Sequence, residues 1–97
     1  MFYRRIYYDK LTGEILDSRM AFGAIRILPI TEELITYPTL SGYNRATAGV
    51  MEWMERDEAV EAKFNAQRLA RIDVSKTPPE MVFEDFPPEG EEHGETD

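Results

Sequence analysis

Residues 2–18 most constrain what this chain can fold into, because they form an apolar-rich run with one polar interruption, the pentapeptide DKLTG. Before it, residues 2–8 (FYRRIYY) are rich in aromatic residues, which suit a β-strand. Within it, the Asp9 side chain can bond to the turn backbone, and Gly13 can take a positive φ. Residues 14–18 can then run back along the first strand. The pattern predicts an N-terminal β-hairpin.

The first predicted strand has apolar side chains on both faces. Successive residues of a strand point to opposite faces of its sheet. One face then carries Phe2, Arg4, Ile6 and Tyr8, and the other carries Tyr3, Arg5 and Tyr7. We therefore expect a strand within a sheet that is covered on at least one side.

The next stretch predicts a short strand and a short helix. Residues 24–28 (AIRIL) form an apolar run that ends at Pro29, because proline cannot donate to a ladder. Thr31 is expected to cap a helix over residues 32–37, whose acidic first turn suits the helix dipole. Residues 39–45 contain Gly and Asn and are expected to form a loop.

Residues 46–71 allow two interpretations. They are rich in Met, Glu, Ala, Lys, Gln and Arg, which would suit one long helix. However, a compact apolar run and a polar break precede Asp57, which is placed as a helix N-cap and would be a poor core residue within a single helix. We therefore predict a strand over 48–54, with Trp53 in the core, and a helix over 58–67. The single long helix remains the alternative.

The C-terminal part predicts a second hairpin and a tail. Residues 69–74 alternate between apolar and charged positions, residues 75–80 are turn-rich, and residues 81–83 return as a strand. Residues 87–97 have no apolar content to offset their ordering entropy, so a disordered acidic tail is expected. Residues 1–86 are then a single domain, since a chain of 97 residues cannot support a second core.

The predicted fold class is α+β, with a small antiparallel sheet built from the N- and C-terminal hairpins and two short helices on one face. Residues 1–79 hold all 11 Lys and Arg and 11 of the 19 acidic residues, so the net charge of −8 lies in residues 80–97. Such an acidic end repels nucleic-acid phosphates. It acts either as a solvating tail or as a contact for a basic partner.

The composition excludes several kinds of catalysis. The chain has no cysteine, and its one histidine, His93, lies in the polar terminal stretch, which excludes thiolate chemistry, histidine-based zinc sites and triads. No Gly-rich phosphate loop or calcium-loop pattern occurs, so no cofactor and no metal are expected. The remaining option is a carboxylate pair drawn from Asp17, Glu52 and Asp73, against which a solvated sheet face is weighed. We therefore predict a protein that is not an enzyme.

A protein-interaction or structural module is the leading hypothesis. A free sheet edge at Phe2–Tyr8 or Met81–Phe86 would accept another strand. The alternative is a small single-stranded nucleic-acid-binding domain that uses Arg4, Arg5 and nearby tyrosines, against which packing at a sheet rim is weighed. We expect a protein partner or a homo-oligomer, and no nucleic-acid or membrane partner. The predicted contact residues are Tyr3, Arg4, Arg5, Tyr7, Tyr37 and Tyr43.

Residues 7–16 (YYDKLTGEIL) resemble the opening hairpin of small, largely uncharacterised proteins encoded by prophages and tailed phages. Residues 71–86, with the Pro- and Glu-rich end that follows, are similar to the close of some of these proteins. The resemblance implies a virion-assembly or accessory role in bacteria, with no catalytic residues to carry over. No apolar run approaches the ~20 residues of a membrane span, and no signal-peptide core is found. The expected location is the cytoplasm, or the virion if the chain is phage-derived.

Overall fold

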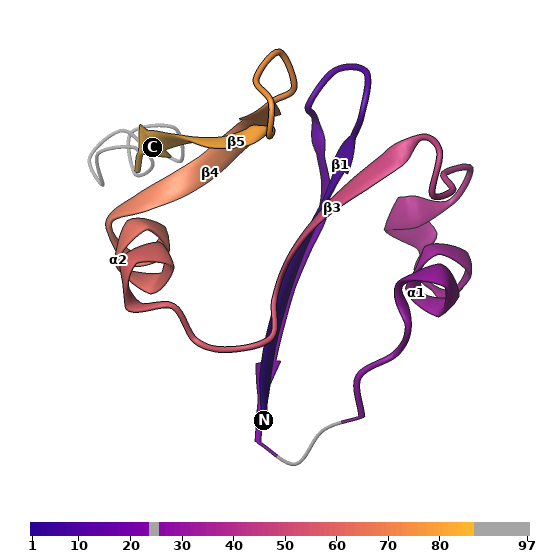
Figure 1. Ribbon diagram of the computed structural model, residues 1–97, viewed down its shortest axis with the longest axis horizontal. Coiled ribbons are helices and arrows are strands. Elements are labelled where there is room, and N and C mark those ends of the chain that lie inside the picture. Colours follow the sequence, from indigo (N-terminus) through magenta and orange to yellow (C-terminus); the bar gives the residue numbers. More distant parts are fainter. Residues whose placement is uncertain (24–25, 87–97) are drawn as a thin grey trace, which may run out of the picture.

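The computed structural model describes residues 1–23 and 26–86 and has the predicted α+β fold (Figure 1). Its strands form two antiparallel sheets, and its two α-helices are short. The elements are β1 (Phe2–Asp9), β2 (Ile15–Phe22), α1 (Ile30–Thr36), the 3-10 helix η1 (Pro38–Leu40), β3 (Ala48–Trp53), α2 (Glu58–Ala66), β4 (Gln67–Asp73) and β5 (Glu80–Asp85). The predicted tail, residues 87–97, lies outside the described residues.

The N-terminal hairpin forms as predicted and is longer than expected. β1 and β2 pair antiparallel from Phe2 opposite Phe22 to Tyr8 opposite Ile15, with a bulge near the turn. The Asp9 carboxylate accepts hydrogen bonds from the backbone N–H groups of Leu11 and Thr12, at 2.8 and 3.2 Å. The turn chemistry read from the sequence therefore sets this hairpin.

Residues 46–71 divide into a strand and a helix, as predicted, rather than forming one helix. β3 pairs antiparallel with β1, so that β1 is the central strand of a sheet in the order β2-β1-β3. Asp57 caps α2, because its carboxylate accepts from the N–H groups of Ala59 and Val60 at 2.9 and 3.2 Å. The helix therefore begins at Glu58, directly after the N-cap that the sequence predicted.

The two hairpins do not share one sheet. β4 and β5 pair with each other in a separate two-stranded sheet, and neither pairs with a strand of the first sheet. The second hairpin instead packs across one face of the first sheet, where Ile72 joins Ile6 and Tyr8 in a buried cluster. At the hairpin tip, the Ile72 N–H donates to the Gly13 carbonyl at 2.8 Å, which fixes the two hairpins against each other.

The helices also differ from the prediction, since they lie on opposite faces of the central sheet (Figure 1). On one face, Tyr7 packs with Leu34 of α1 and with Leu40 of η1. On the other face, the cluster around Ile6 includes Phe64 of α2. The alternation along β1 explains this arrangement, because neighbouring residues supply apolar side chains to both faces.

The strand predicted over residues 24–28 is not observed. Residues 26–28 have no regular structure, and residues 24–25 lie outside the described part. The Leu28 carbonyl accepts a hydrogen bond from the Arg5 side chain instead of a ladder partner. α1 begins at Ile30 with Pro29 at the N-cap, so the predicted cap at Thr31 is also wrong.

The close approach at Gly13 predicts a test of how the hairpins are joined. Gly13 has φ +82°, and an added Cβ would lie 1.9 Å from the Ile72 carbonyl oxygen. Gly42 has φ +86° with nothing within 4 Å of an added Cβ, so it is the matched control. We expect Gly42→Ala to lower the free energy of unfolding by about 1–2 kcal/mol. Gly13→Ala should cost about 1–3 kcal/mol more, because the hairpins must also move apart.

Urea unfolding of the two variants measures this difference. Equal losses of stability in Gly13→Ala and Gly42→Ala would show that the contact with Ile72 contributes nothing.

Candidate functional site

One face of β1 carries a polar cluster around Arg5, which we call the Arg5 cluster (Arg5, Tyr7, Glu33 and Glu52); all of its members except Glu52 are buried. Glu33 of α1 is 1% exposed, and its Oε1 accepts from Arg5 at 2.8 Å and from the Tyr7 hydroxyl at 2.5 Å. The Arg5 Nε donates to Glu52 of β3 at 2.6 Å. Among the described residues, no buried side-chain nitrogen or oxygen lacks a hydrogen-bond partner. The cluster therefore connects α1 and two strands of the sheet through satisfied charges.

The environment of the Arg5 cluster favours one protonation state of each group. Burial raises the pKa of Tyr7, and the hydrogen bond to the Glu33 carboxylate raises it further. Burial acts to lower the pKa of Arg5, but hydrogen bonds to Glu33 and Glu52 outweigh it, so the pKa of this guanidinium is raised. The tyrosine is thus held neutral as a donor, and the arginine is held charged.

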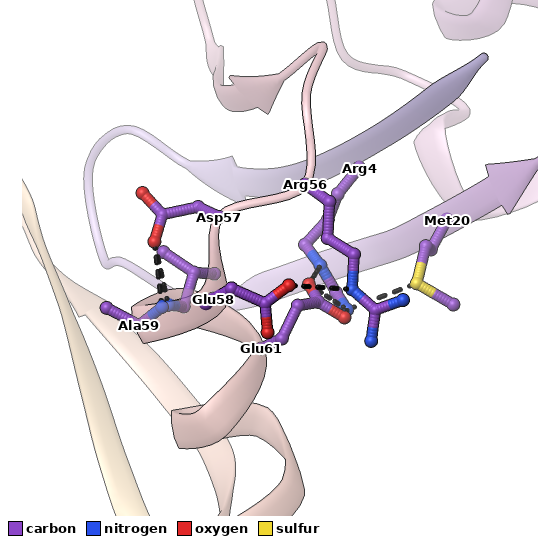
Figure 2. A network of polar contacts seen from close by, with 8 residues as sticks. Arg4, Met20, Arg56, Asp57, Glu58, Ala59 and Glu61 are labelled. Carbon is purple, nitrogen blue, oxygen red and sulfur yellow. Dashed lines mark hydrogen bonds and ion pairs between the residues drawn. The ribbon is translucent and has the colours of Figure 1, made fainter.

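The opposite face of β1 carries the equivalent contact to α2, made by Arg4 (Figure 2). The Arg4 guanidinium donates to both carboxylate oxygens of Glu61, at 2.9–3.1 Å. It also lies 4.1 Å from the centre of the Phe64 ring and contacts the Met20 sulfur at 3.2 Å. The Arg56–Glu58 pair beside it is more open, with a 3.6 Å separation and both side chains largely exposed.

Four of the six predicted contact residues are consequently buried, which corrects the expectation that they form an exposed surface. Tyr3, Arg4, Arg5 and Tyr7 are 9, 7, 5 and 0% exposed. The reason is that β1 is central and covered on both faces, and that both arginines are engaged by helix carboxylates. From the sequence, the two alternatives for these residues were exposure to solvent and packing at a sheet rim.

The other two predicted contact residues, Tyr37 and Tyr43, are half-buried and lie outside β1 in the sequence, but they pack against the cluster around Tyr7. The Arg19 guanidinium lies 3.2 Å from the centre of the Tyr37 ring. The Tyr43 hydroxyl donates to Asp9 at 2.9 Å, and this hydrogen bond raises the pKa of Tyr43 and lowers that of Asp9. Both tyrosines therefore make structural contacts within the fold.

The three carboxylates considered for catalysis each have a different partner. Asp17 pairs with Arg19 at 2.9 Å, Glu52 belongs to the Arg5 cluster, and Asp73 accepts from Ser75 at 2.5 Å. Within residues 1–23 and 26–86, no three His, Cys, Asp or Glu side chains are placed to hold a metal ion. The structure shows no contact that joins the three carboxylates into one site.

A surface that the sequence did not indicate lies on β2. Phe22 is 73% exposed and Met20 is 46% exposed, and both point to the same face as the partly buried Phe2. With Arg56 and Glu61 these three residues line a depression of about 210 Å³. We call Phe2, Met20 and Phe22 the β2 edge surface. The signal in the sequence was the apolar segment Met20-Ala21-Phe22, which continues the strand beyond its predicted end.

The free edges also differ from those expected. Residues 2–8 belong to the central strand and are paired on both sides, so they offer no edge. β5 pairs only with β4, which leaves its outer side open among the described residues, as proposed for Met81–Phe86. β2 and β3 are likewise the edge strands of the first sheet in this part of the chain.

Comparison with known proteins adds no relative: no protein-family model, curated protein or solved structure matches this chain. Across the described residues, every helix is too short or too polar to cross a lipid bilayer.

Removing the carboxylate of Glu33 is expected to be strongly destabilising. Glu33→Ala would leave the Arg5 charge and the Tyr7 hydroxyl without their shared buried acceptor, at a cost of about 3–5 kcal/mol in unfolding free energy. Glu32→Ala is the control, because Glu32 is exposed in the same helical turn and should cost less than about 1 kcal/mol. Chemical denaturation of both variants checks this expectation, which similar losses would refute.

The raised pKa of Tyr7 predicts a loss of stability in alkali. A tyrosine whose pKa is higher in the folded state contributes its full stability below its unfolded pKa of about 10, and that stability is lost as the pH rises above it. We expect the unfolding free energy to decline above about pH 10 and the decline to be shallower in Tyr7→Phe. Tyr43→Phe should keep most of the decline, because Tyr43 lies near the surface. An unchanged pH dependence in Tyr7→Phe would contradict the assignment.

Proposed function

We propose that this chain is a non-enzymatic protein-interaction module and that the β2 edge surface is where it contacts its partner. The observation that carries the proposal is the pair of exposed apolar side chains, Met20 and Phe22, on an edge strand. Apolar residues on an open sheet edge favour contact with another polypeptide, through the backbone as well as through side chains.

The other open edges support this choice by contrast. The second sheet carries charged residues on both strands, including Arg68 on β4 with Glu84 and Asp85 on β5. Charged side chains on an edge strand discourage pairing with another chain. The segment Met20-Ala21-Phe22 has no charge and no proline. Among the edge strands β2, β3, β4 and β5 of the described residues, β2 alone has large apolar side chains that are exposed, Met20 and Phe22.

The alternative function, single-stranded nucleic-acid binding, relied on Arg4, Arg5 and nearby tyrosines. Binding of this kind needs cations that are free to meet phosphates and aromatic faces that are free to stack on bases. Both arginines are buried in ion pairs with helix carboxylates, at 2.9 Å for Arg4 and 2.8 Å for Arg5. These contacts favour the protein-interaction proposal over the nucleic-acid alternative.

The likeness of residues 7–16 to phage proteins adds a biological setting to the proposal. In that setting the chain acts as a virion-assembly or accessory component, in the bacterial cytoplasm or in the virion. A role of this kind needs a contact surface and no chemistry, which agrees with the β2 edge surface.

Site-specific photocrosslinking tests the proposed function. A benzophenone amino acid replaces Phe22 in one version of the chain and Ile35 in the other. Ile35 is the matched control because it is 85% exposed on α1, which covers the opposite face of the central sheet. We expect irradiation in the source cells to give polypeptide adducts, either with the chain itself or with another protein. Their yield should be several times higher from position 22 than from position 35. Absent adducts, or equal yields from the two positions, would refute the proposal.

A further inference from the structure

We propose that the partner at the β2 edge surface is a second copy of this chain, joined by antiparallel pairing of the two β2 strands about a twofold axis at Met20. The inference rests on the proposed function, because it uses the same surface. It follows from the hydrogen-bond phase of β2, from a register that keeps its arginines apart, and from the apolar side chains that this register brings together.

The hydrogen-bond phase of β2 determines which backbone groups face outward. The Gly23 N–H donates to the Met1 carbonyl at 2.8 Å, one step beyond the pairing of Phe2 with Phe22. Antiparallel pairs alternate between bonded and non-bonded, so the bonded pairs that follow along the strand are Tyr3 with Ala21 and Arg5 with Arg19. The N–H and C=O groups of Ser18, Met20 and Phe22 therefore point away from β1.

The opposite side of β1 agrees with this phase. The Lys10 N–H donates to the Thr47 carbonyl at 3.0 Å, at the end of the β1–β3 ladder. Even-numbered residues of β1 thus bond to β3, and odd-numbered residues bond to β2. Both edges of the central strand are accounted for, and no strand among residues 1–23 and 26–86 covers the outer side of β2.

A twofold axis at Met20 makes this outer edge self-complementary. Met20 would lie opposite the second copy's Met20, and Ser18 opposite the second copy's Phe22. Every residue in these pairs presents outward N–H and C=O groups, so each pair can exchange two hydrogen bonds. Closed pairing of identical edges about a twofold axis is also the commonest symmetry of protein dimers.

Charge and strand length distinguish this register from those with an axis at Arg19 or Ala21. With the axis at Met20, Arg19 lies opposite the second copy's Ala21. An axis at Arg19 would place two arginines directly opposite each other in a close non-bonded pair, which is destabilising. An axis at Ala21 would leave fewer β2 residues paired, because the strand ends at Phe22. In a register shifted by one residue, the outward N–H and C=O groups of Met20 would lie opposite a residue of the second copy whose N–H and C=O groups point inward, toward β1.

The same register brings the exposed apolar side chains together. Met20 and Phe22 lie on the face that carries α2, so the two copies would form one continuous apolar strip there, flanked by the Phe2 side chains. The neighbouring charges are already paired within each copy, Arg4 with Glu61 and Arg19 with Asp17. Association would therefore bury apolar surface without leaving an unpaired charge at the axis.

The interface is small, so the dimer should be concentration-dependent. Stable complexes usually bury about 800 Å² on each partner, and one short strand edge with two large side chains lies at the low end of this scale. We expect dissociation in the micromolar range, which analytical ultracentrifugation of the full chain can follow from the low micromolar to the near-millimolar range.

Two variants and a matched control test the position of the interface. Phe22→Asp places a charge in the apolar strip, and Met20→Pro removes the outward N–H at the axis while leaving the β1–β2 ladder bonds intact. Both should weaken dimerisation at least tenfold, while Ile35→Asp on α1 should not change it. Far-ultraviolet circular dichroism shows whether each variant keeps the fold. A dimer that withstands both folded variants would place the interface elsewhere and overturn the inference.

A single-cysteine experiment tests the axis without depending on destabilising variants. The chain contains no cysteine, so Met20→Cys and Ile35→Cys each introduce one thiol. Paired residues at the axis of an antiparallel ladder have Cα atoms about 5.5 Å apart, within the range for a disulfide. Mild oxidation should convert Met20→Cys to a covalent dimer at least ten times faster than Ile35→Cys. Equal rates would refute the axis at Met20.

The outcomes for the inference and for the proposed function can be told apart. If the chain is monomeric at all concentrations but crosslinks from position 22 to a different polypeptide, the inference that the partner is a second copy is refuted. The proposed function as an interaction module is then supported. A monomer that gives no adducts from position 22 overturns both.

Discussion

Two neighbouring arginines in the central strand connect the three layers of this molecule. Arg4 and Arg5 point to opposite faces of β1, and each meets a carboxylate of the helix that covers its face, Glu61 of α2 or Glu33 of α1. Isolated charges in such positions would be costly, but here every buried polar side-chain atom of the described residues has a partner. The position of each helix therefore depends on a charge supplied by the sheet, in addition to the apolar clusters on either face.

Features whose causes lie within a few residues could be read from the sequence. The turn at Asp9 and Gly13 and the helix cap at Asp57 were predicted because each depends on a side chain bonding to backbone groups two or three residues away. Strand pairing between the hairpins was not predictable in this way. The second hairpin does not pair with the first sheet, although the outer edges of β2 and β3 are open; it packs on the face of that sheet through Ile72, which contacts residues far away in the sequence. Residues 26–28 of the strand expected over residues 24–28 are irregular, and the Leu28 carbonyl accepts from Arg5, a distant residue whose role a local pattern does not show.

The candidate site was harder to predict, because a charged residue in a sequence is ordinarily taken as exposed. Arg4 and Arg5 looked like a basic surface, whereas their partners were hidden within helical patterns. Glu33 follows Ile30 by three residues and precedes Leu34 by one, so it lies on the apolar side of α1. Glu61 precedes Phe64 by three residues, so it lies on the apolar side of α2. Acidic residues on the inner side of two helices, together with adjacent arginines in a strand, were the available signal.

The opposed directions of Arg4 and Arg5 also restrict how the chain can change in length. Deleting or inserting one residue within β1 would exchange the two faces, so that side chains fitted to α1 would turn toward α2. One of the two carboxylates, Glu33 or Glu61, would then meet an aliphatic or aromatic group, while the other would meet the wrong arginine. Variation in length among descendants of this sequence should therefore fall in the connections, while the spacing from Tyr3 to Tyr8 stays fixed.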